Sequence, residues 1–254
     1  MVHIMKNSAF HFLLFCLVVA LITPVTAHAF KLVPMSVKMT SSGRGASEIF
    51  VVDNSGAKPI AVEMKIFIRN MTEEGEDILT ESEDDFIVFP AQMIVMPGQS
   101  QSVRIQWMGQ EPDKELAYRL VAEQLPLNLE EEVNDGGRIN VVFRYVASVY
   151  IVPKRRIQAD VKITSAYVEE GNRDDDSNSL IIIAHNEGSK HTVLREPTLT
   201  LNTATNKIVL KSEQLPGLDG ANILVGHTRV FKLPRPTGLH TGPLEADLQF
   251  YGKR

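Results

Sequence analysis

Apolar and polar residues alternate with a period of two along much of the chain. The segment IAVEMKIFIRNM (60–71) alternates clearly, and SQSVRIQW (100–107) places Val103, Ile105 and Trp107 on one face. This period is typical of β-strands that bury one face. Seven short strand-like segments occur between residues 30 and 153, and turn residues such as Gly, Asn and Pro separate them.

A second group of strand-like segments begins near residue 160 and continues to the end of the chain. It includes SLIIIAHNEG (179–188) and ILVGHTRVFKLP (223–234). Between the groups, the basic run that follows Pro153 interrupts the pattern and indicates a hinge at 154–159. The number and spacing of strands predict an all-β protein with two immunoglobulin-like β-sandwich domains, 30–153 and 160–254.

The last strand of the first group, RINVVFRYVASVYIVP (138–153), is unusually apolar. A period of two divides it into an odd-numbered set that is apolar from Ile139 to Ile151 and a mixed even-numbered set. Both faces therefore need cover, as in a parallel sheet flanked by helices. The sequence shows no convincing helix, so another partner must lie against one face.

The first 29 residues have the layout of a cleaved secretory signal. Lys6 precedes an apolar stretch from Phe12 to Ile22, and Ala27-His28-Ala29 supplies a small-residue cleavage pattern. The alternative is a membrane anchor, but the stretch is shorter than the roughly 20 residues that span a bilayer. We expect residues 1–29 to be removed, which leaves an exported protein without an integral membrane segment.

Composition excludes several classes of function. Cys16 is the only cysteine and lies in the signal, so the mature chain has neither disulfides nor thiolate chemistry. Loss of Lys6 with the signal would lower the 26 basic residues to 25, against 31 acidic ones, for a net charge of −6. This mildly acidic balance argues against nucleic acid as a partner.

Motifs for catalysis and metal binding are missing from the sequence. The mature histidines form no HExxH or HxH pair, and the acidic runs 73–77 and 81–85 lack the spacing and glycine of a calcium loop. These runs fit better as solvated loops that keep a sheet edge soluble. A GxSxG elbow and a glycine-rich phosphate loop are also missing. We therefore expect no enzyme activity, no metal and no other cofactor.

Several segments resemble periplasmic pilus chaperones of the PapD type. FPAQMIVMPGQSQSVRIQW (89–107) is similar to a family strand that leads through a PG turn into a VR-containing strand, and AYRLVAEQLP (117–126) is similar to the next one. INVVFRYVASVYIVP (139–153) resembles the last strand of the first domain, and FVVDN and IIIAHNEG resemble a strand-then-Asn motif in each domain. The resemblance covers nearly all of 30–254, and YRLVAEQLP looks more like the archaic, non-classical subgroup.

This resemblance implies a function. Such chaperones are L-shaped pairs of immunoglobulin-like domains that bind exported pilin subunits, which lack one strand, and serve pilus assembly with an outer-membrane usher. The chaperone lends its last first-domain strand, which is a form of β-augmentation. One face of 138–153 would then cover its own core, and the other would supply the core that the pilin lacks. The exposed edge also predicts self-association of the free protein.

The odd-numbered set of this strand contains the candidates for donated side chains: Ile139, Val141, Phe143 and Tyr145. The alternative is that this set belongs to the domain's own core, because alternation alone does not show which face points inward. The alignment of the strand to Pro153 in the family pattern favours donation.

The family also grips the C-terminal carboxylate of the pilin with a basic pair. Counting back from Asn54 places Lys38 opposite the first basic residue. Counting back from Pro153 places Ser148 where the family normally has lysine, so the sequence departs from the pattern there. Arg119 is our candidate replacement, because arginine can bind a carboxylate bidentately. The alternative is an ordinary solvated arginine on the outer face of a strand.

Two other functions occur among exported all-β proteins. An adhesin or carbohydrate-binding module would need exposed aromatic platforms, and Trp107 inside a strand is poor support for one. A hydrolase of unfamiliar type would need a catalytic site, and the motifs supply none.

Overall fold

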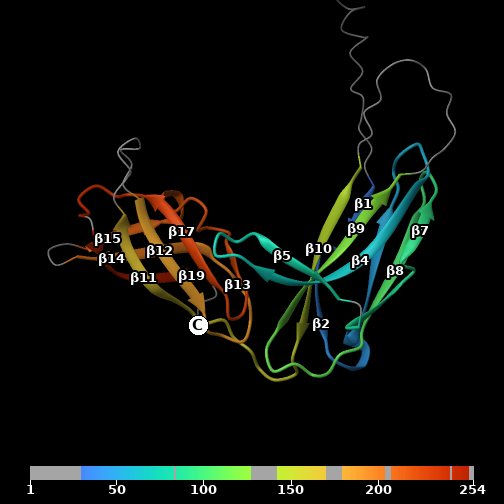
Figure 1. Cartoon of the computed structure of the whole chain (residues 1–254), viewed down its shortest axis with the longest axis horizontal. Coiled ribbons are helices and arrows are strands. Elements are labelled where there is room, and N and C mark those ends of the chain that lie inside the picture. Colours follow the sequence, from blue (N-terminus) through green and yellow to red (C-terminus); the bar gives the residue numbers. More distant parts are fainter. Residues whose placement is uncertain are drawn as a thin grey trace, which may run out of the picture.

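A computed structural model of the chain describes residues 30–82, 84–126, 142–169, 179–203, 207–240 and 242–251. The signal segment 1–29 lies outside the described residues. The described residues form two β-sandwich domains that meet at an angle beside the linking segment (Figure 1). The prediction of an all-β fold is thus confirmed. Among the described residues, no helix has the length and apolar character needed to cross a membrane.

The first domain consists of two facing sheets. One sheet has the order β1-β3-β8-β6, formed by Lys31–Val33, Ser47–Asp53, Ser100–Trp107 and Phe86–Phe89. The other has the order β2-β10-β9-β4-β5, formed by Ser36–Thr40, Arg144–Val152, Leu116–Leu125, Ile60–Met71 and Asp77–Glu81; β7 (Gln92–Val95) also pairs with β4. A 3-10 turn, η1 (Gly43–Ala46), precedes β3.

Two prolines mark the points where the chain changes sheets. Pro34 separates β1 in the first sheet from β2 in the second, and Pro90 separates β6 from β7 in the same way. Proline has no backbone N–H to donate to a ladder, so it favours the end of a strand over its middle.

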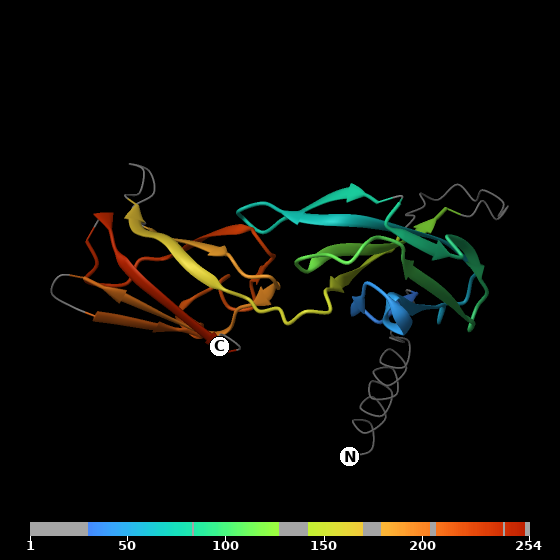
Figure 2. The same ribbon diagram turned by 90° about the horizontal axis from the view of Figure 1, so that it is seen from below.

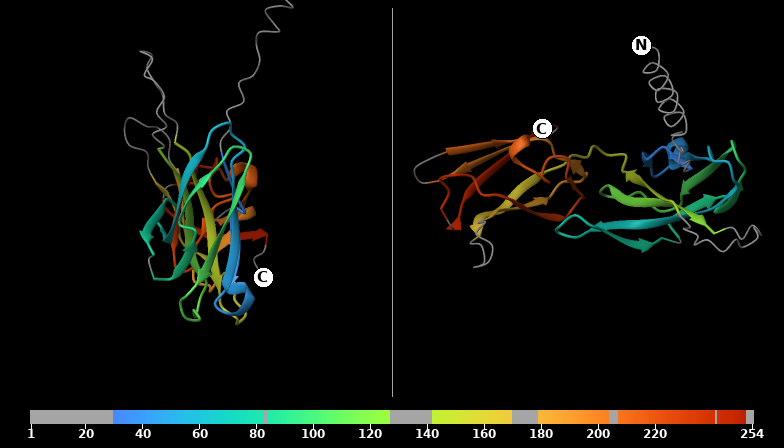
Figure 3. Two further views of the ribbon diagram at one scale, coloured as in Figure 1. Left: turned by 90° about the vertical axis from the view of Figure 1, so that its right-hand side faces the viewer. Right: turned by 90° about the horizontal axis from the view of Figure 1, so that it is seen from above.

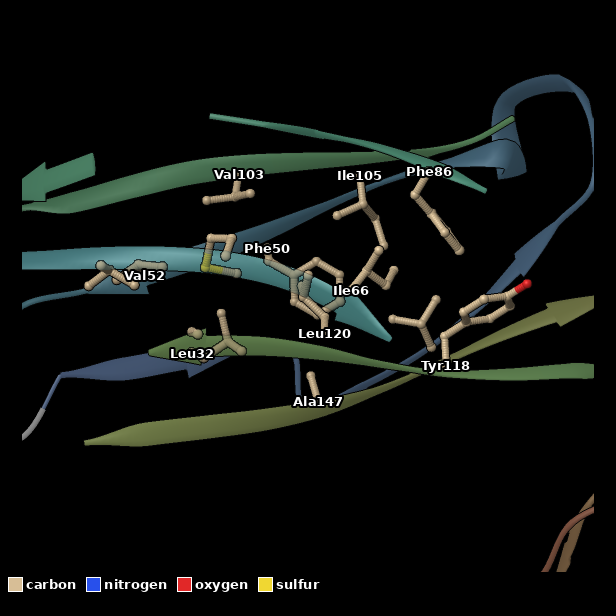
Figure 4. Packing of buried hydrophobic residues seen from close by; sticks show 14 of the residues in the cluster. Leu32, Phe50, Val52, Ile66, Phe86, Val103, Ile105, Tyr118, Leu120 and Ala147 are labelled. Carbon is tan, nitrogen blue, oxygen red and sulfur yellow. The ribbon is translucent and has the colours of Figure 1, made fainter. Parts of the chain in front are cut away.

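The core of the first domain lies between its two sheets. Figure 4 shows apolar side chains from both sheets, among them Phe50 and Leu120, pointing toward one another. Both side chains are fully buried, as are Val103 and Ile105 on the facing strand β8. Trp107 is also buried, with edge-on contacts to the rings of Phe86 and Tyr118. It therefore offers no aromatic platform for a sugar.

The second domain repeats the sandwich with a different strand order. One sheet has the order β17-β12-β11-β18, formed by Thr228–Pro234, Ser179–Asn186, Val161–Glu169 and Gly242–Pro243. Opposite it stand β15-β14-β19, formed by Lys207–Lys211, Arg195–Asn202 and Glu245–Tyr251. A short pair, β13 (Thr192–Val193) and β16 (Asn222–Ile223), and a 3-10 turn, η2 (Ser212–Gln214), complete the domain. Leucines dominate its separate core.

A buried asparagine closes a loop in each domain. The Asn54 amide donates to the carbonyls of Lys58 and Val95 at 2.9 Å each, and its side-chain oxygen accepts from the Gly56 N–H. Asn186 makes the matching set with the carbonyls of Lys190 and Ile223 and the N–H of Gly188. Buried polar groups are costly unless bonded, which explains why an asparagine ends the strand at both places.

Candidate functional site

Strand β10 is paired on both sides along only part of its length. From Ser148 to Ile151 it lies between β9 and the parallel strand β2. From Arg144 to Ala147 its described partner is β9 alone, on one side. Unpaired backbone N–H and C=O groups at a sheet edge can pair with another strand. In the described part of β10, Arg144–Ala147 is therefore an open edge.

The odd-numbered side chains of β10 face the core of the first domain. Ala147, Val149 and Ile151 are fully buried there, and Phe143 and Tyr145 pack partly against the same cluster. The Tyr145 ring also contacts the Phe30 ring edge-on, with centroids 4.7 Å apart. In the described part of the strand, the odd-numbered face thus covers the domain's own core from Ala147 to Ile151, and donation of Phe143 and Tyr145 stays a prediction. Ile139 and Val141 lie outside the described residues, so their donation stays a prediction.

The even-numbered face of β10 finds its cover in the second domain. The Tyr150 ring stacks on the ring of His191 with centroids 3.9 Å apart and planes 6° from parallel. Leu224 of the second domain joins Tyr150 and Met71 in a small buried cluster. The second face of the apolar strand is thus covered near its C-terminal end by the neighbouring domain.

Lys38 and Arg119 lie on this same even-numbered face, on either side of β10. The strand register places Lys38 opposite Tyr150 and Arg119 opposite Ser148. Because residues two apart on a strand share a face, the two cations lie close to the point where β2 begins to pair with β10. The Lys38 side chain is exposed. The register therefore places both predicted members of the basic pair on one face of the sheet, on either side of β10.

Arg119 is held by two side chains. Its Nη1 donates to Ser148 Oγ, and its Nε donates to Asp77 Oδ2 at 2.7 Å. Its side chain is 17% exposed, so Arg119 is not an ordinary solvated arginine. Ser148, where the resemblance predicts a lysine, thus contacts a guanidinium from the neighbouring strand.

Asp77 bridges two arginines. Arg69 Nε donates to Asp77 Oδ1 at 2.7 Å, and Arg69 Nη1 donates to the Tyr150 hydroxyl at 3.2 Å. Burial alone would raise the pKa of Asp77, but the hydrogen bonds from Arg119 and Arg69 outweigh it and lower this pKa. Two guanidinium groups share one carboxylate, so the cluster keeps a net positive charge.

Sequence reasoning missed Arg69 and Asp77. The alternation of 60–71 already placed Arg69 on the same face as Phe67. The missing information was the hairpin register, in which Met71 pairs with Asp77 and Arg69 with Leu79. This register puts Asp77 diagonally across from Arg69, within reach of long side chains.

The acidic runs do more than solvate an edge. Glu73, Glu74 and Glu76 are exposed, but the backbone of their turn contacts the second domain through Arg229 and Val230. In the second run, the Asp85 carboxylate accepts from Ser82 and from the Tyr118 hydroxyl. Among the described residues, no three His, Cys, Asp or Glu side chains are grouped so that they could hold a metal ion.

Comparison with known families yields one match. A model described as "Pili and flagellar-assembly chaperone, PapD N-terminal domain" matches residues 30–156, which is half of the chain. No curated protein matches the chain in a sequence search.

Solved structures of fimbrial chaperone systems share the fold. A chain of the CsuC–CsuE chaperone–tip subunit pre-assembly complex, from archaic Csu pili of Acinetobacter baumannii, is 15% identical with a TM-score of 0.59, and the match covers 87% of this chain and 97% of that one. A chain of the chaperone–tip adhesin complex of CFA/I fimbriae is 17% identical with a TM-score of 0.54 over 87% and 98%. A chain of the Salmonella enterica SafA pilin–SafB chaperone complex is 15% identical with a TM-score of 0.51 over 89% and 98%.

Proposed function

Because the chain belongs to the family of pili and flagellar-assembly chaperones, which are not enzymes, we propose that it captures pilin subunits in the periplasm by lending them a strand and delivers them to an outer-membrane usher. The predicted signal 1–29 would bring it to that compartment. The relatives with a similar fold come from complexes with a pilin or a tip subunit, which supports pilins as partners.

The observation that carries the proposal is the position of the open edge of β10. The edge at Arg144–Ala147 ends at Ser148, where β2 takes over the pairing. The Arg119 guanidinium contacts Ser148 at this end, and Lys38 lies one position further along on the same face. A pilin strand added along the open edge would therefore end beside two cations.

Strand donation would use the odd-numbered side chains Ile139, Val141, Phe143 and Tyr145. Phe143 and Tyr145 are only partly buried against the domain's own core, so they keep surface for a second contact. A strand added beside β10 would bring its own core against this end of the sandwich. In this arrangement the donated side chains extend the chaperone's core toward the pilin.

The cations would fix the register of the added strand. A slip by one residue turns every donated side chain to the wrong face, so a fixed end point is valuable. The pilin's terminal carboxylate can accept hydrogen bonds from both Lys38 and Arg119, and a guanidinium has more N–H donors than its contacts with Asp77 and Ser148 use. Charge-assisted bonds of this kind contribute about 1.5–3 kcal/mol each.

Co-expression with a pilin tests the proposal. The chaperone should co-purify with the pilin in a one-to-one complex and gain thermal stability, because a partner that binds the folded state stabilises it by mass action. The same edge should promote self-association without pilin, which sedimentation at increasing concentration would detect. If the thermal stability of the purified protein and its stoichiometry are unchanged by co-expression of pilins, the proposed function is contradicted.

A further inference from the structure

The tip of the hairpin formed by β4 and β5, which belongs to the first domain, contacts the second domain. Figure 2 and the right-hand view in Figure 3 show its tip beside the second domain. The tip is a tight turn in which Thr72 N–H donates to the Glu76 carbonyl at 2.9 Å and Gly75 N–H donates to the Thr72 carbonyl at 3.0 Å. Asp77 is the first residue of the strand that leaves this turn.

Arg229 of the second domain holds the hairpin tip. Its guanidinium donates to the carbonyls of Glu73 and Glu74, and the Val230 N–H donates to the Glu73 carbonyl at 2.8 Å. Burial lowers the pKa of Arg229, and Glu76 and Glu74 only partly counter this effect. These contacts use backbone groups of the tip and fix its position relative to β17.

Gly75 lets Arg229 approach this closely. A Cβ atom at Gly75 would lie 2.2 Å from Cζ of Arg229, and the residue has φ +94°. Both the contact and the backbone angle disfavour any side chain at this position. The turn is therefore shaped to receive the guanidinium of the second domain.

A continuous set of contacts runs from this clamp to the cation beside β10. Asp77 follows the clamped turn, and its carboxylate accepts from Arg119 at 2.7 Å on one oxygen and from Arg69 at 2.7 Å on the other. Arg69 donates in turn to Tyr150, whose hydroxyl also accepts from Asn222 of the second domain at 3.3 Å. The orientation of Arg119 thus depends on a residue whose hairpin is held by the other domain.

We propose that Asp77 is the positioning residue of the carboxylate grip, and that the second domain keeps it in place through Arg229. The Asp77 carboxylate accepts a hydrogen bond from Nε of Arg119, and the Ser148 hydroxyl accepts one from Nη1. With these two contacts the planar guanidinium is fixed, and its remaining N–H donors are held ready for the pilin. This inference rests on the proposed function, because the grip is useful only if Arg119 binds a pilin carboxylate.

The first experiment needs no pilin. Proton–nitrogen NMR of the folded protein should show a slowly exchanging Nε–H signal for Arg119, which Arg119→Lys identifies by its absence. Asp77→Asn should shift this signal and speed its exchange at least about tenfold, because the charge-assisted hydrogen bond is lost. Asp247→Asn is the matched control: it removes an exposed carboxylate from β19 in the second domain. An Arg119 signal unchanged in Asp77→Asn overturns the proposal.

The second experiment measures carboxylate discrimination, which is the affinity for a pilin with a free C-terminus divided by that for the same pilin amidated. The wild type should show a ratio of about 10–100 for a charge-assisted grip. Asp77→Asn should lower this ratio at least about fivefold and change the affinity for amidated pilin less than about twofold, because only the oriented part of binding is lost. A general loss of stability would instead weaken both pilins equally.

Three other outcomes are decisive. A higher ratio in Asp77→Asn would mean that Asp77 competes with the pilin for Arg119, and the positioning role would be refuted. Arg229→Ala should also lower the ratio. An unchanged ratio in this variant would refute the claim that the second domain keeps Asp77 in place. A wild type that does not discriminate, together with the expected NMR change, would refute the carboxylate grip of the proposed function and leave the orientation of Arg119 by Asp77 supported.

Discussion

Each domain is a β-sandwich with a buried asparagine at the end of a strand, but the two domains differ in the edge strands of their sheets. In the second domain the edge strand β15 carries Lys207 and Lys211 at its ends, and charges at an edge discourage pairing with other chains. In the first domain β10 presents the open edge Arg144–Ala147 in its described part, next to a cluster with net positive charge. The difference fits the proposed function, in which the first domain offers the edge that binds a pilin and the second domain supports it.

The largest expected effect is on pilin capture. It should appear when an apolar residue of the proposed donor strand is replaced by aspartate, and not when an apolar residue of β15 is replaced in the same way. Val141→Asp should reduce pilin capture below detection, because burial of a valine side chain in the complex would contribute about 1.5–3 kcal/mol and the aspartate would place a charge in the pilin core. Val209→Asp, at a side chain that is 46% exposed in the second domain, should have no effect. Pull-down with a co-expressed pilin measures both. Loss of folding in Val141→Asp, seen by circular dichroism, would place Val141 in the chaperone's own core.

Phe143→Asp tests how one strand serves two cores. Phe143 packs partly against the first domain's own cluster, so this variant should weaken pilin capture and also lower the free energy of unfolding by about 1–3 kcal/mol. Urea unfolding of the free protein measures the second effect. A variant with unchanged stability would show that Phe143 contributes nothing to its own domain.

The basic pair should have the next largest effect. Lys38→Ala and Arg119→Ala should each weaken binding of a pilin with a free C-terminus by about 10- to 100-fold, because each removes a charge-assisted hydrogen bond. Lys211→Ala, which removes a cation from the edge of the second domain, is the control. Isothermal titration with free and amidated pilins gives the coupling in a double cycle. Additive losses would mean that the substituted cation does not touch the carboxylate.

The asparagines should have similar effects in the two domains. Asn54→Ala and Asn186→Ala each remove the donor to a buried backbone carbonyl, that of Val95 and that of Ile223, and an unsatisfied buried group costs about 1–3 kcal/mol. Hydrogen exchange should show faster opening of β3 and β4 in the first variant and of β12 and β17 in the second. Faster exchange throughout both domains in either variant would instead show that the two sandwiches unfold as one unit.

The smallest expected effect concerns pH. The pKa of Asp77 is lowered in the folded protein, so its contribution to stability is fully present above the usual value of 3.8 and is lost as the pH falls through the lower folded value. Wild type should therefore be more stable than Asp77→Asn at pH 7, and the difference should shrink as the pH falls below 3.8. Urea unfolding at a series of pH values measures this. A difference that stays constant down to acid pH would show that the charge of Asp77 is not responsible.

The sequence by itself determined the strands and their grouping. Alternation with a period of two is a local property, because successive side chains of a strand point to opposite faces. Residues 60–71 and 100–107 could therefore be assigned to strands without any tertiary contact. The interruption of the strand at Pro34 follows from a missing N–H, which is equally local, whereas the change of sheet there is a tertiary feature. The order of family-like segments then led to the chaperone family and to Lys38 and Arg119 as a pair.

Only the tertiary structure decided which face of β10 points inward and what surrounds Arg119. The apolar odd-numbered set was compatible with either direction, and the packing of Ala147 and Val149 resolves the choice. The contact between Asp77 and Arg119 joins residues 42 positions apart, and Arg229 reaches Glu73 from 156 positions away. Such contacts depend on the register of several strands and on the docking of two domains. A period of two describes one strand at a time, so it specifies neither of them.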